Sequence, residues 1–497
     1  MNPSLLLPAP ILLPLVGAAL TLLAHRRLAA QRTIAISVLT ASLGVTVALL
    51  ATVVRGGAVA AQAGGWEAPM GITLAADRFG ALMAVIAVVM LLAVLVYAIG
   101  QLDPDVEELF FHPLYLVLAA GVSAAFLTGD LFNLFVAFEI LLIASYVLLT
   151  LGAGRGQIRH GMTYVVINLV ASTLFVVGVA YVYAATGSVN MADLAGRIGD
   201  LPPAIREALG LLFLVTFGIK AGLFPLYFWL PDSYPAAPPA VTAVFAGLLT
   251  KVGIYAIIRT QTLLFASDGP STLLLFVAGA TMLVGVLGAV SQGEIRRILS
   301  FHIVSQVGYM ILGLGLFTVA GVAGAILYVV HHIVVKTTLF CVGGAVEQAY
   351  GTGRLASLGG VARRTPLLAG LFGIAALSLA GLPPFSGFVA KLSLTEAGLA
   401  SGRWLVVAVG LLVSALTLFS MTKIWAGAFW GRPSATVAGD GVAARVAVPL
   451  PMLAATVALV ALSLAIAVFA GPLWDFSQSA ASELLDPSGY VRAVMGP

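Results

Sequence analysis

Four lysines, Lys220, Lys251, Lys336 and Lys391, each lie inside a long apolar stretch of this sequence. A lysine at the centre of a membrane helix costs roughly 2.5–3.5 kcal/mol on insertion scales, and such residues commonly mark ion pathways. Lys220 and Lys251 flank a proline-rich break in FGIKAGLFPLYFWLPDSYPAAPPAVTAVFAGLLTK, residues 217–251. We interpret this stretch as part of an ion path, around which the rest of the chain is organised.

A carboxylate, Glu139, is the natural partner of Lys220. It lies in DLFNLFVAFEILLIASYVLL, about 13 Å beyond the expected helix cap Asp130 at 1.5 Å per residue. At that depth a carboxylate must be paired or protonated. Burial disfavours the charged lysine and a nearby carboxylate favours it, so the pair predicts a coupled switch that holds or releases a proton. The alternative is a static ion pair that locks two helices.

The segment YVVHHIVVKTTLF carries further groups that exchange protons. His332 and Lys336 are four residues apart, on one helix face, and Tyr328 extends that face by a turn. Such a stripe supports a hydrogen-bonded relay. His331 points elsewhere, either as a satisfied core histidine or as a supporting polar group. Further metal ligands are missing from this neighbourhood, so no metal site is expected.

A second polar cluster occurs in SFHIVSQVGYM, where His302, Ser305 and Gln306 stand close together. Two interpretations stay open, interhelical hydrogen bonds and a role in transport. Arg259 lies near the expected end of its helix, where we expect it to snorkel to the membrane surface. No phosphate-binding glycine loop, nucleophile elbow, haem spacing or iron–sulfur spacing occurs, so no cofactor is expected.

The composition requires a membrane environment for these groups. Apolar residues make up 61% of the chain and charged residues 9%, against about 45–50% and about 25% in soluble domains. Only helices and closed barrels satisfy the backbone in hydrocarbon, and the apolar runs of about 20 residues are too long for barrel strands. The chain is therefore predicted to be an all-α polytopic membrane protein. Its single cysteine, Cys341, allows no intrachain disulfide.

Apolar runs separated by loop signals predict about 14 transmembrane helices. The first lacks the basic residues that precede the apolar core of a signal peptide, so we expect it to be retained. The predicted helices are 4–24, 33–54, 79–100, 112–129, 131–151, 162–185, 207–230, 240–263, 271–290, 298–317, 321–345, 366–399, 404–430 and 448–471.

Basic residues predict the orientation of these helices. Under this assignment one side of the membrane receives the loops that contain Arg26/Arg27/Arg32, Arg155/Arg159, Arg296/Arg297, Arg354/Arg363/Arg364 and Arg432/Arg445. The positive-inside rule makes that side cytoplasmic, and the even number of helices then places both termini outside.

Two of the predicted helices are interrupted. Segment 366–399 would reach roughly 50 Å as a straight helix, against a hydrocarbon core of about 30 Å, and Pro383 and Pro384 break it shortly before Lys391. Pro225 similarly follows Lys220. Paired interrupted helices are typical of inverted-repeat transporters. We therefore divide the chain into the first three helices at residues 1–111, a first five-helix repeat at 112–263, a second five-helix repeat at 271–430, and a last helix with a tail at 431–497.

The chain resembles the proton-translocating antiporter-like family shared by Mrp-type cation/proton antiporters and respiratory complex I. The segments that carry the resemblance are DLFNLFVAFEILLIASYVLL, TGSVNMADLA, the proline-rich stretch 217–251 with its two lysines, FHIVSQVGYM, HHIVVKTTLF and LAGLPPFSGFVAK. The likeness covers about residues 70–430. Certain complex I members have Glu where this chain has Lys391, or His where it has Lys251, which favours the Mrp-type members.

The resemblance implies a function and an architecture. It implies a 14-helix fold with five-helix inverted repeats at helices 4–8 and 9–13, and discontinuous helices 7 and 12. Glu139 and Lys220 would be the charge pair, Lys251 and Lys336 would lie on a central hydrophilic axis, and Lys391 would end it. The expected function is Na⁺/proton exchange by a bacterial plasma-membrane complex that includes other Mrp subunits. The alternative is a proton-pumping subunit of a complex I-like oxidoreductase or a membrane-bound hydrogenase.

Overall fold

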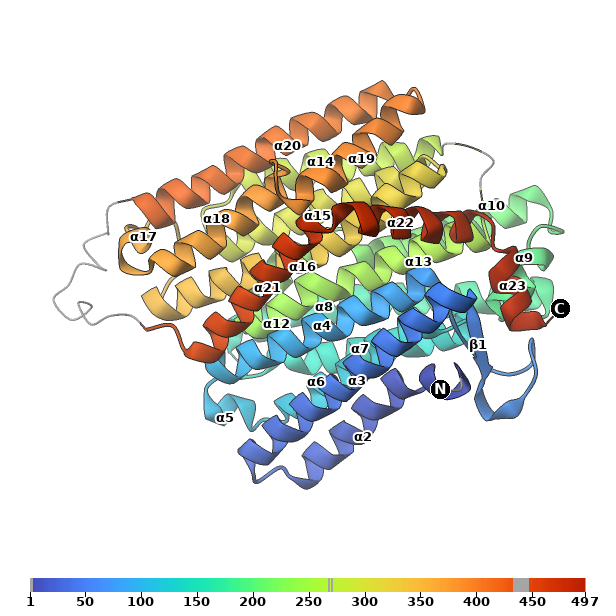
Figure 1. Cartoon of the computed structure of the whole chain (residues 1–497), viewed down its shortest axis with the longest axis horizontal. Helices are drawn as coiled ribbons and strands as arrows, with labels where there is room; N and C mark the ends of the chain where they lie inside the picture. The colour runs from blue at the N-terminus through green and yellow to red at the C-terminus, as the bar shows by residue number, and fades with distance from the viewer. Residues whose placement is uncertain (1–2, 153, 267–268, 270, 432–446, 497) are drawn as a thin grey trace.

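The chain forms a bundle of long helices with a small β-hairpin at one end (Figure 1). The computed structural model describes residues 3–152, 154–266, 269, 271–431 and 447–496. Up to the middle of the chain the elements are α1 (Pro3–Leu6), α2 (Ala9–Leu23), α3 (Leu28–Gly56), β1 (Val59–Gln62), β2 (Thr73–Ala76), α4 (Arg78–Gln101), α5 (Pro104–Glu107), α6 (Phe111–Leu127), α7 (Leu131–Thr150), α8 (Arg155–Thr186), α9 (Met191–Arg197), α10 (Pro203–Ala221), α11 (Leu230–Ser233), α12 (Pro239–Val244), the π-helical η3 (Phe245–Leu249) and α13 (Thr250–Leu263).

The second half of the chain is likewise helical. Its elements are α14 (Thr272–Ser291), α15 (Ile295–Gly315), α16 (Val319–Tyr350), α17 (Val361–Arg364), α18 (Pro366–Ala380), α19 (Ser386–Ala400), α20 (Trp404–Ile424), the π-helical η4 (Trp425–Trp430), α21 (Leu450–Val468), α22 (Ala470–Leu485) and α23 (Ser488–Met495).

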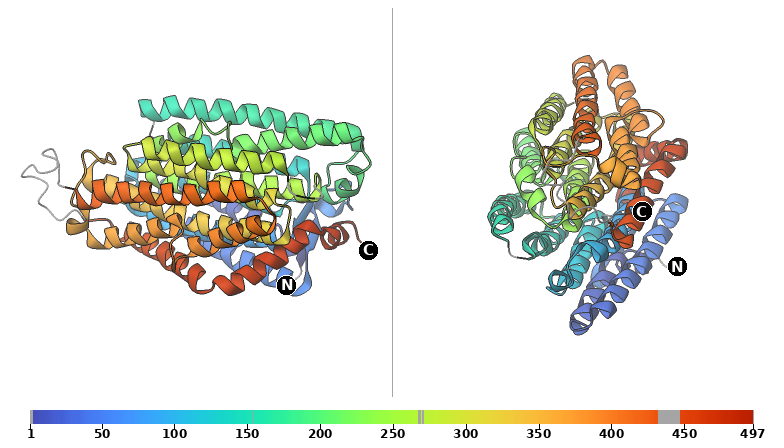
Figure 2. Two further views of the ribbon diagram at one scale, coloured as in Figure 1. Left: turned by 90° about the horizontal axis from the view of Figure 1, so that it is seen from above. Right: turned by 90° about the vertical axis from the view of Figure 1, so that its left-hand side faces the viewer.

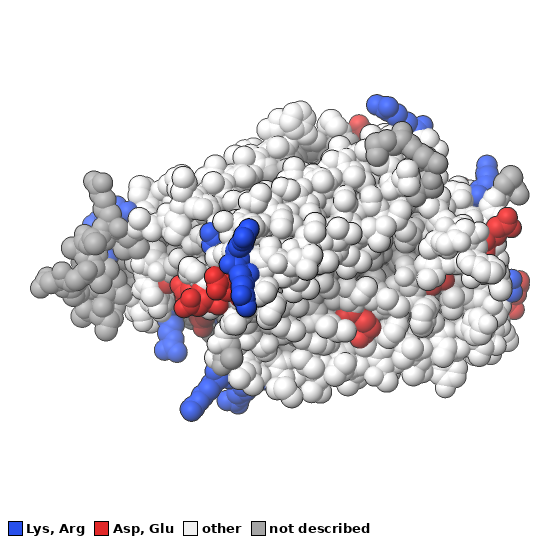
Figure 3. All heavy atoms as spheres, turned by 90° about the horizontal axis from the view of Figure 1, so that it is seen from below, with Lys and Arg blue, Asp and Glu red and all other residues white. Residues whose placement is uncertain are grey.

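Within the described residues, ten helices are long and apolar enough to cross a membrane, and α2, α6 and α18 are shorter apolar helices. The all-helical membrane class is thereby confirmed, whereas the count of about 14 crossings stays a prediction. The long helices run in a common direction in the left view of Figure 2 and are seen nearly end-on in the right view, and the face in Figure 3 carries few charges between its two ends. An apolar belt of this kind is what a bilayer requires.

Helix α16 is the centre of the bundle. Every residue of its apolar window is buried, as in the continuous helix formed by α12, η3 and α13, whereas only 33% of the corresponding window is buried in α20. Helix α16 packs against α4, α12, α15, α18, α19, α21 and α22. The two central helices carry Lys251, His332 and Lys336, so the bundle encloses these polar groups on all sides.

Both interrupted segments end their first helix in the same way. Helix α10 ends at Ala221 and α18 ends at Ala380, and each is followed by a glycine, Gly222 or Gly381, in the left-handed conformation. Glycine adopts this conformation without the penalty that a Cβ brings, and it closes the last helical turn. Pro225, Pro383 and Pro384 lie in the non-helical segments that follow.

The loops fall at two ends of the bundle. One end, here called the arginine-rich end, joins the loops near Arg32, Gly100, Ala237, Glu294 and Arg354 through hydrogen bonds, ion pairs and a β-bridge. The basic loops named above meet there, although Arg432 and Arg445 lie outside the described residues. The other end, the hairpin end, holds β1, β2 and both termini (Figure 1).

The C-terminal part is more helical than the sequence predicted. We expected one last helix over 448–471 and a tail, but α21 ends at Val468 and the chain continues as α22 and α23. Helix α22 packs on α16 and α4, and Glu483 forms an ion pair with Arg78. The sequence of α22 is too polar to be predicted as a membrane helix from hydropathy. Its packing on α16 and α4 and the ion pair of Glu483 stabilise it instead.

Candidate functional site

A serine hydroxyl joins the carboxylate and the lysine that the sequence singled out. Ser172 on α8 donates a short hydrogen bond to Glu139 on α7 and accepts one from Lys220 Nζ at 3.2 Å. In the part of the chain that the structure describes, Glu139 and Lys220 form no direct ion pair. The arrangement is therefore a three-membered chain, carboxylate to hydroxyl to ammonium.

Sequence reasoning missed Ser172, although a signal exists. Tyr164, Asn168 and Ser172 recur at intervals of four on α8, and all three are buried. Polar residues with this spacing share one helix face. On a helix whose remaining surface largely faces outward, such a buried polar stripe indicates a polar interior.

Local structure fixes the position of Lys220. It occupies the last turn of α10, which Gly222 closes, and only 4% of the residue is exposed. Its ammonium lies 4.9 Å from the centre of the Phe138 ring. Trp229 donates its indole hydrogen to the Ile219 carbonyl at 3.0 Å. The same carbonyl also accepts a hydrogen bond from the Gly222 backbone N–H at 3.2 Å, so the last turn of α10 is held from both sides.

A small cavity of about 10 Å³ lies beside Lys220. Asn168, Tyr234 and Leu249 are among its lining residues, and the Tyr234 hydroxyl has no hydrogen-bond partner among the described residues. A polar cavity of this size holds about one water molecule. The cavity reaches from Lys220 to η3, the segment that precedes Lys251.

The π-helical segment η3 positions Lys251. Lys251 is fully buried, and its Nζ donates to the Ala246 carbonyl at 2.5 Å and to Thr250 Oγ1 at 3.1 Å. A π-helical turn widens the helix and is frequent at functional sites. Here it ends two residues before the lysine, and its Ala246 carbonyl accepts the hydrogen bond from the buried ammonium.

The expected stripe of Tyr328, His332 and Lys336 lies on α16, and all three side chains are buried in the bundle. The rings of Tyr328 and His332 are stacked with centroids 6.4 Å apart. Neither ring nitrogen of His332 has a hydrogen-bond partner among the described residues, and the same holds for Lys336 Nζ. Buried polar groups are almost always satisfied by protein or ordered water, so this stripe calls for water between its members.

The second helix break connects His331 with the region of Lys391. His331 Nδ1 lies 2.8 Å from Ser386 Oγ at the start of α19, and Ser386 in turn lies 3.2 Å from Ser378 on α18. Lys391 donates to the Ala380 carbonyl, at the end of α18, at 3.0 Å. Its ammonium also lies 4.9 Å from the centre of the Tyr309 ring.

The cluster on α15 makes interhelical hydrogen bonds. His302 Nε2 lies 2.9 Å from Ser420 Oγ on α20, and Ser305 donates to the Met282 carbonyl on α14 at 3.0 Å. Gln306 accepts a short hydrogen bond from Tyr328. Ser305 bonds to a backbone carbonyl, which fits a packing role. His302 and Gln306 instead bond to the polar side chains of Ser420 and Tyr328.

The buried groups influence one another through their charges: the lysines and histidines repel one another when protonated, and Glu139 attracts Lys220. Lys251 interacts with His332 and Lys336, and His302 interacts with Lys336 and Lys391. Glu139 interacts with Lys220. The described interactions do not include a direct one between Lys220 and Lys251, and the 10 Å³ cavity extends from Lys220 only as far as Leu249 of η3.

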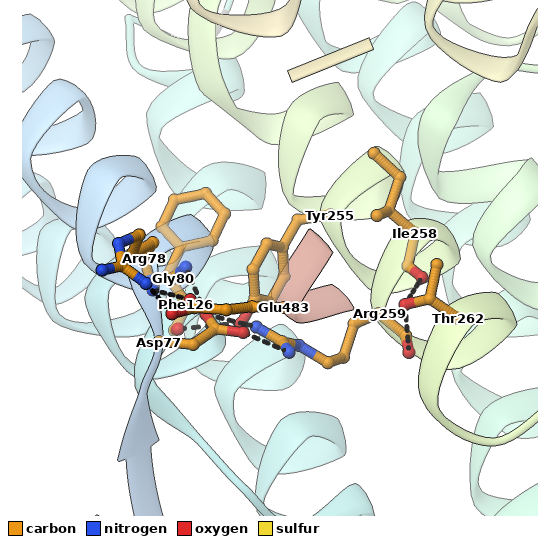
Figure 4. Close-up of polar contacts among 9 residues, drawn as sticks. All are labelled: Asp77, Arg78, Gly80, Phe126, Tyr255, Ile258, Arg259, Thr262 and Glu483. Atoms are coloured by element: carbon orange, nitrogen blue, oxygen red, sulfur yellow. Dashed lines mark hydrogen bonds and ion pairs between the residues drawn. The ribbon is translucent and has the colours of Figure 1, made fainter. Parts of the chain in front are cut away.

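The expectation for Arg259 was wrong. Instead of snorkelling to the surface, this residue is 4% exposed and binds both carboxylate oxygens of Asp77, at 2.7 and 2.8 Å. Figure 4 shows the two side chains facing each other beside Tyr255. The partner stands at the start of α4, 182 positions away in the sequence, so local hydropathy could not predict the pair.

A further carboxylate, Asp130, caps α7, the helix that carries Glu139. Its Oδ1 accepts a hydrogen bond from the Asn133 backbone at 2.8 Å. Burial raises the pKa of Asp130 to about 6, partly opposed by hydrogen bonds from the backbone of Asn133 and Phe132. This cap therefore titrates at a mildly acidic pH.

Comparison with known proteins gives consistent matches along the chain. The profile of the family described as NADH:quinone oxidoreductase/Mrp antiporter, TM, matches residues 128–417. The D-type subunit of the Na⁺/H⁺ antiporter of Alkalihalophilus pseudofirmus is 45% identical over 490 residues, which is 98% of each chain.

Solved structures match the whole fold. A chain of the Mrp complex from Dietzia sp. DQ12-45-1b is 37% identical with a TM-score of 0.92, and the match covers 100% of both chains. A chain of the membrane-bound sulfane sulfur reductase, an archaeal respiratory membrane complex, is 27% identical with a TM-score of 0.90 and covers 99% of this chain and 100% of its own.

Proposed function

This chain belongs to the NADH:quinone oxidoreductase/Mrp antiporter family of membrane proteins, and from that premise we propose that it serves as the D-type subunit of a multisubunit Na⁺/H⁺ antiporter. It is a transporter subunit and works in a hetero-oligomer with other Mrp subunits. The near full-length relationship to a D-type antiporter subunit carries this proposal. The alternative, a subunit of a redox-driven complex, draws on the weaker likeness to the sulfane sulfur reductase.

The proposed proton path begins at Glu139 and Lys220 and follows the buried polar groups. Its members are Glu139, Lys220, Lys251, His332, Lys336 and Lys391, with His331, His302, Ser305 and Tyr328 in support. The hydrogen-bonded chain from Glu139 through Ser172 to Lys220 supports the start of this order. The charge interactions of Lys251 with His332 and Lys336, and of His302 with Lys336 and Lys391, support its continuation. Waters would complete the path at the unpartnered His332 and Lys336.

The Glu139–Ser172–Lys220 chain is the proposed switch. With Lys220 held toward Glu139 through Ser172, the ammonium keeps its proton because the carboxylate stabilises the charge. If Lys220 moves toward the cavity lined by Asn168 and Tyr234, it loses that stabilisation and releases the proton toward Lys251. The Ser172 hydroxyl donates one hydrogen bond and accepts another, so it couples the Glu139 carboxylate to the Lys220 ammonium.

The proposed architecture keeps about 14 crossings and two inverted repeats, 112–263 and 271–430, between 1–111 and 431–497. The matching ends of α10 and α18, each closed by a left-handed glycine, support this division. The proposed location is the bacterial plasma membrane, with the arginine-rich end in the cytoplasm and both termini outside, by the positive-inside rule.

An orientation test uses single cysteines in a Cys341→Ser background. Arg364→Cys lies at the arginine-rich end and Asp200→Cys at the hairpin end, and both positions are exposed. A membrane-impermeant maleimide added to intact cells should label only position 200, and both positions after permeabilisation. Labelling of position 364 in intact cells would reverse the proposed orientation.

The function is tested with the whole complex in vesicles that carry a pH gradient. Addition of Na⁺ should dissipate the gradient, and Glu139→Gln or Lys220→Ala should abolish most of this exchange in complexes that assemble normally. Glu396→Gln is the matched control, because this glutamate is exposed on α19 away from Lys391's buried face. Full exchange in both path variants would refute the relay. Proton movement that requires an electron donor would favour the redox-driven alternative.

A further inference from the structure

A groove of about 610 Å³ runs along the outer surface between α14 and α20. Thr272, Phe276, Gly279 and Leu283 line it from one face of α14, and the start of α20 lines the opposite side. The volume is that of a small-molecule site, for which about 300–1,000 Å³ is typical. The two helices lie at the periphery of the bundle in Figures 1 and 2.

The length of the groove matches one membrane leaflet. From Thr272 to Leu283 the helix rises roughly 16 Å at 1.5 Å per residue, about half of a 30 Å hydrocarbon core. One acyl chain spans a single leaflet, whereas a transmembrane helix of a partner would contact both halves of α14. The extent of the groove therefore favours a lipid as its occupant.

The hollow depends on a small residue. A Cβ placed on Gly279 would meet only Val406 Cγ2, at 3.9 Å, so the space above this glycine is open. Large apolar side chains rim the same surface, with Phe276 67% exposed and Leu405 82% exposed. An acyl chain lying against Gly279 would cover the exposed side chains of Phe276 and Leu405. It would also fill the open space above the glycine.

The mouth of the groove is positively charged. Arg403 lines it at the hairpin end, and its Nε is buried without a hydrogen-bond partner among the described residues. Arg403 is also the N-cap of α20 and gives no side-chain cap, and Trp404, Leu405 and Val406 of the first turn of that helix line the same groove. Helix N-termini and arginine forks both favour phosphate. Trp404, 67% exposed, is typical of the membrane interface.

We propose that the groove between α14 and α20 binds one anionic phospholipid, with its phosphate on Arg403 and one acyl chain along Gly279. This site does not depend on the proton path, since none of its lining residues belongs to that path. The chemistry specifies a negatively charged headgroup because Arg403 has no carboxylate partner among the described ion pairs.

The test measures lipid retained by the assembled complex. Complexes from nanodiscs of phosphatidylcholine with phosphatidylglycerol are examined by native mass spectrometry under increasing activation. The wild-type complex should retain one phosphatidylglycerol that Arg403→Gln loses, and phosphatidylcholine should not replace it. Gly279→Leu should lose the same lipid, because its side chain fills the groove.

Two matched controls separate this site from general effects. Arg55→Gln removes an exposed arginine at the same end of the bundle, and Gly370→Leu adds the same side chain at an exposed glycine of α18 with nothing within 4 Å. Both should retain the lipid. Unchanged retention in Arg403→Gln and Gly279→Leu would overturn the proposal. Loss of subunit assembly in Gly279→Leu, with no lipid retained by the wild type, would also overturn it by assigning the groove to a partner helix.

Discussion

Ser172 holds Glu139 and Lys220 in one hydrogen-bonded chain, so its hydroxyl should set the rate of the proposed switch. Hydrogen bonds to charged groups contribute about 1.5–3 kcal/mol, and every 1.4 kcal/mol is about tenfold in an equilibrium. We predict that Ser172→Ala lowers Na⁺-driven dissipation of a pH gradient about tenfold or more. Ser172→Thr, which keeps the hydroxyl, should retain much of the activity.

The matched control for this prediction is the next residue on α8. Thr173 is exposed and donates its hydroxyl only to the Leu169 carbonyl of its own helix. Thr173→Ala should leave exchange at the wild-type level. Equal exchange by Ser172→Ala and Thr173→Ala, in complexes assembled to the same extent, would remove Ser172 from the switch.

The raised pKa of Asp130 predicts a pH-dependent stability. Between the ordinary aspartate value of 3.8 and about 6, the folded state holds the proton more tightly than the unfolded state. The contribution of Asp130 to stability therefore falls as pH rises through that window. About two pKa units correspond to about 3 kcal/mol at 1.36 kcal/mol per unit. In thermal denaturation in detergent, the melting temperature of Asp130→Asn should rise relative to that of the wild type as the pH is raised from 4 to 7.

Asparagine caps helices about as well as aspartate, so Asp130→Asn removes the charge and keeps the cap. Asp200→Asn, at an exposed loop position of the same end, should follow the wild type at every pH. A constant difference between Asp130→Asn and the wild type across the range would show that the buried charge does not control stability.

At the scale of residues, the sequence predicts charged groups better than their connections. Glu139, Lys220, Lys251 and Lys336 stand out because a charge inside an apolar run is expensive and rare. A serine such as Ser172 carries no such cost, so composition does not distinguish a bridge from a packing residue. Only the fold brings α8 between α7 and α10 and gives that hydroxyl its two partners.

Among the elements, the contact between α10 and α13 controls the position of Lys220. A Cβ on Gly253 would lie 2.8 Å from the Ala221 nitrogen and 3.1 Å from the Lys220 carbonyl carbon. These are backbone atoms of the last turn of α10, which cannot rotate away. Overpacking of this kind costs about 1–3 kcal/mol. We predict that Gly253→Ala lowers both the melting temperature and the exchange rate of the complex.

Gly44→Ala is the control for this substitution. Gly44 lies within α3, and a Cβ there would meet nothing within 4 Å. Alanine is a better helix former than glycine by about 1 kcal/mol, so the control should be neutral or slightly stabilising. If both variants melt and transport alike, α13 does not depend on a close approach at Gly253.

Most elements follow from apolar run length and from proline and glycine. The break after Ala380 follows from Gly381, Pro383 and Pro384, whose conformations end a helix whatever surrounds them. Local patterns do not predict the hairpin of β1 and β2 or the helices α22 and α23, because these segments are short or polar. Such elements are stabilised by tertiary contacts, which a local pattern does not contain.

For the whole molecule, the C-terminal part closes the hairpin end of the bundle. Glu483 on α22 pairs with Arg78 at the start of α4, and the Tyr490 ring lies 5.2 Å from the Arg259 guanidinium. Arg259 in turn binds Asp77. Helices from the N-terminal, middle and C-terminal thirds therefore meet at one cluster, between residues up to 405 positions apart.

The Asp77–Arg259 pair should therefore have a large effect on the stability of the entire bundle. Burial raises the pKa of Asp77, but the charge and hydrogen bonds of Arg259 outweigh it, so that the net pKa is lowered and the carboxylate stays ionised. Removing one partner of a buried pair costs about 3–5 kcal/mol, because an uncompensated charge remains. We predict that Arg259→Gln lowers the free energy of unfolding in detergent by about that amount.

The double variant Asp77→Asn/Arg259→Gln separates the buried charge from the lost contacts. It removes both charges and keeps a polar cap at position 77, so it should recover more than half of the stability that Arg259→Gln loses. Arg197→Gln is the control, since Arg197 is 49% exposed in its pair with Asp193 and surface pairs contribute about 0–1 kcal/mol. A double variant as unstable as Arg259→Gln would mean that packing of the guanidinium between Tyr255 and Tyr490, and not charge compensation, joins the three parts of the chain.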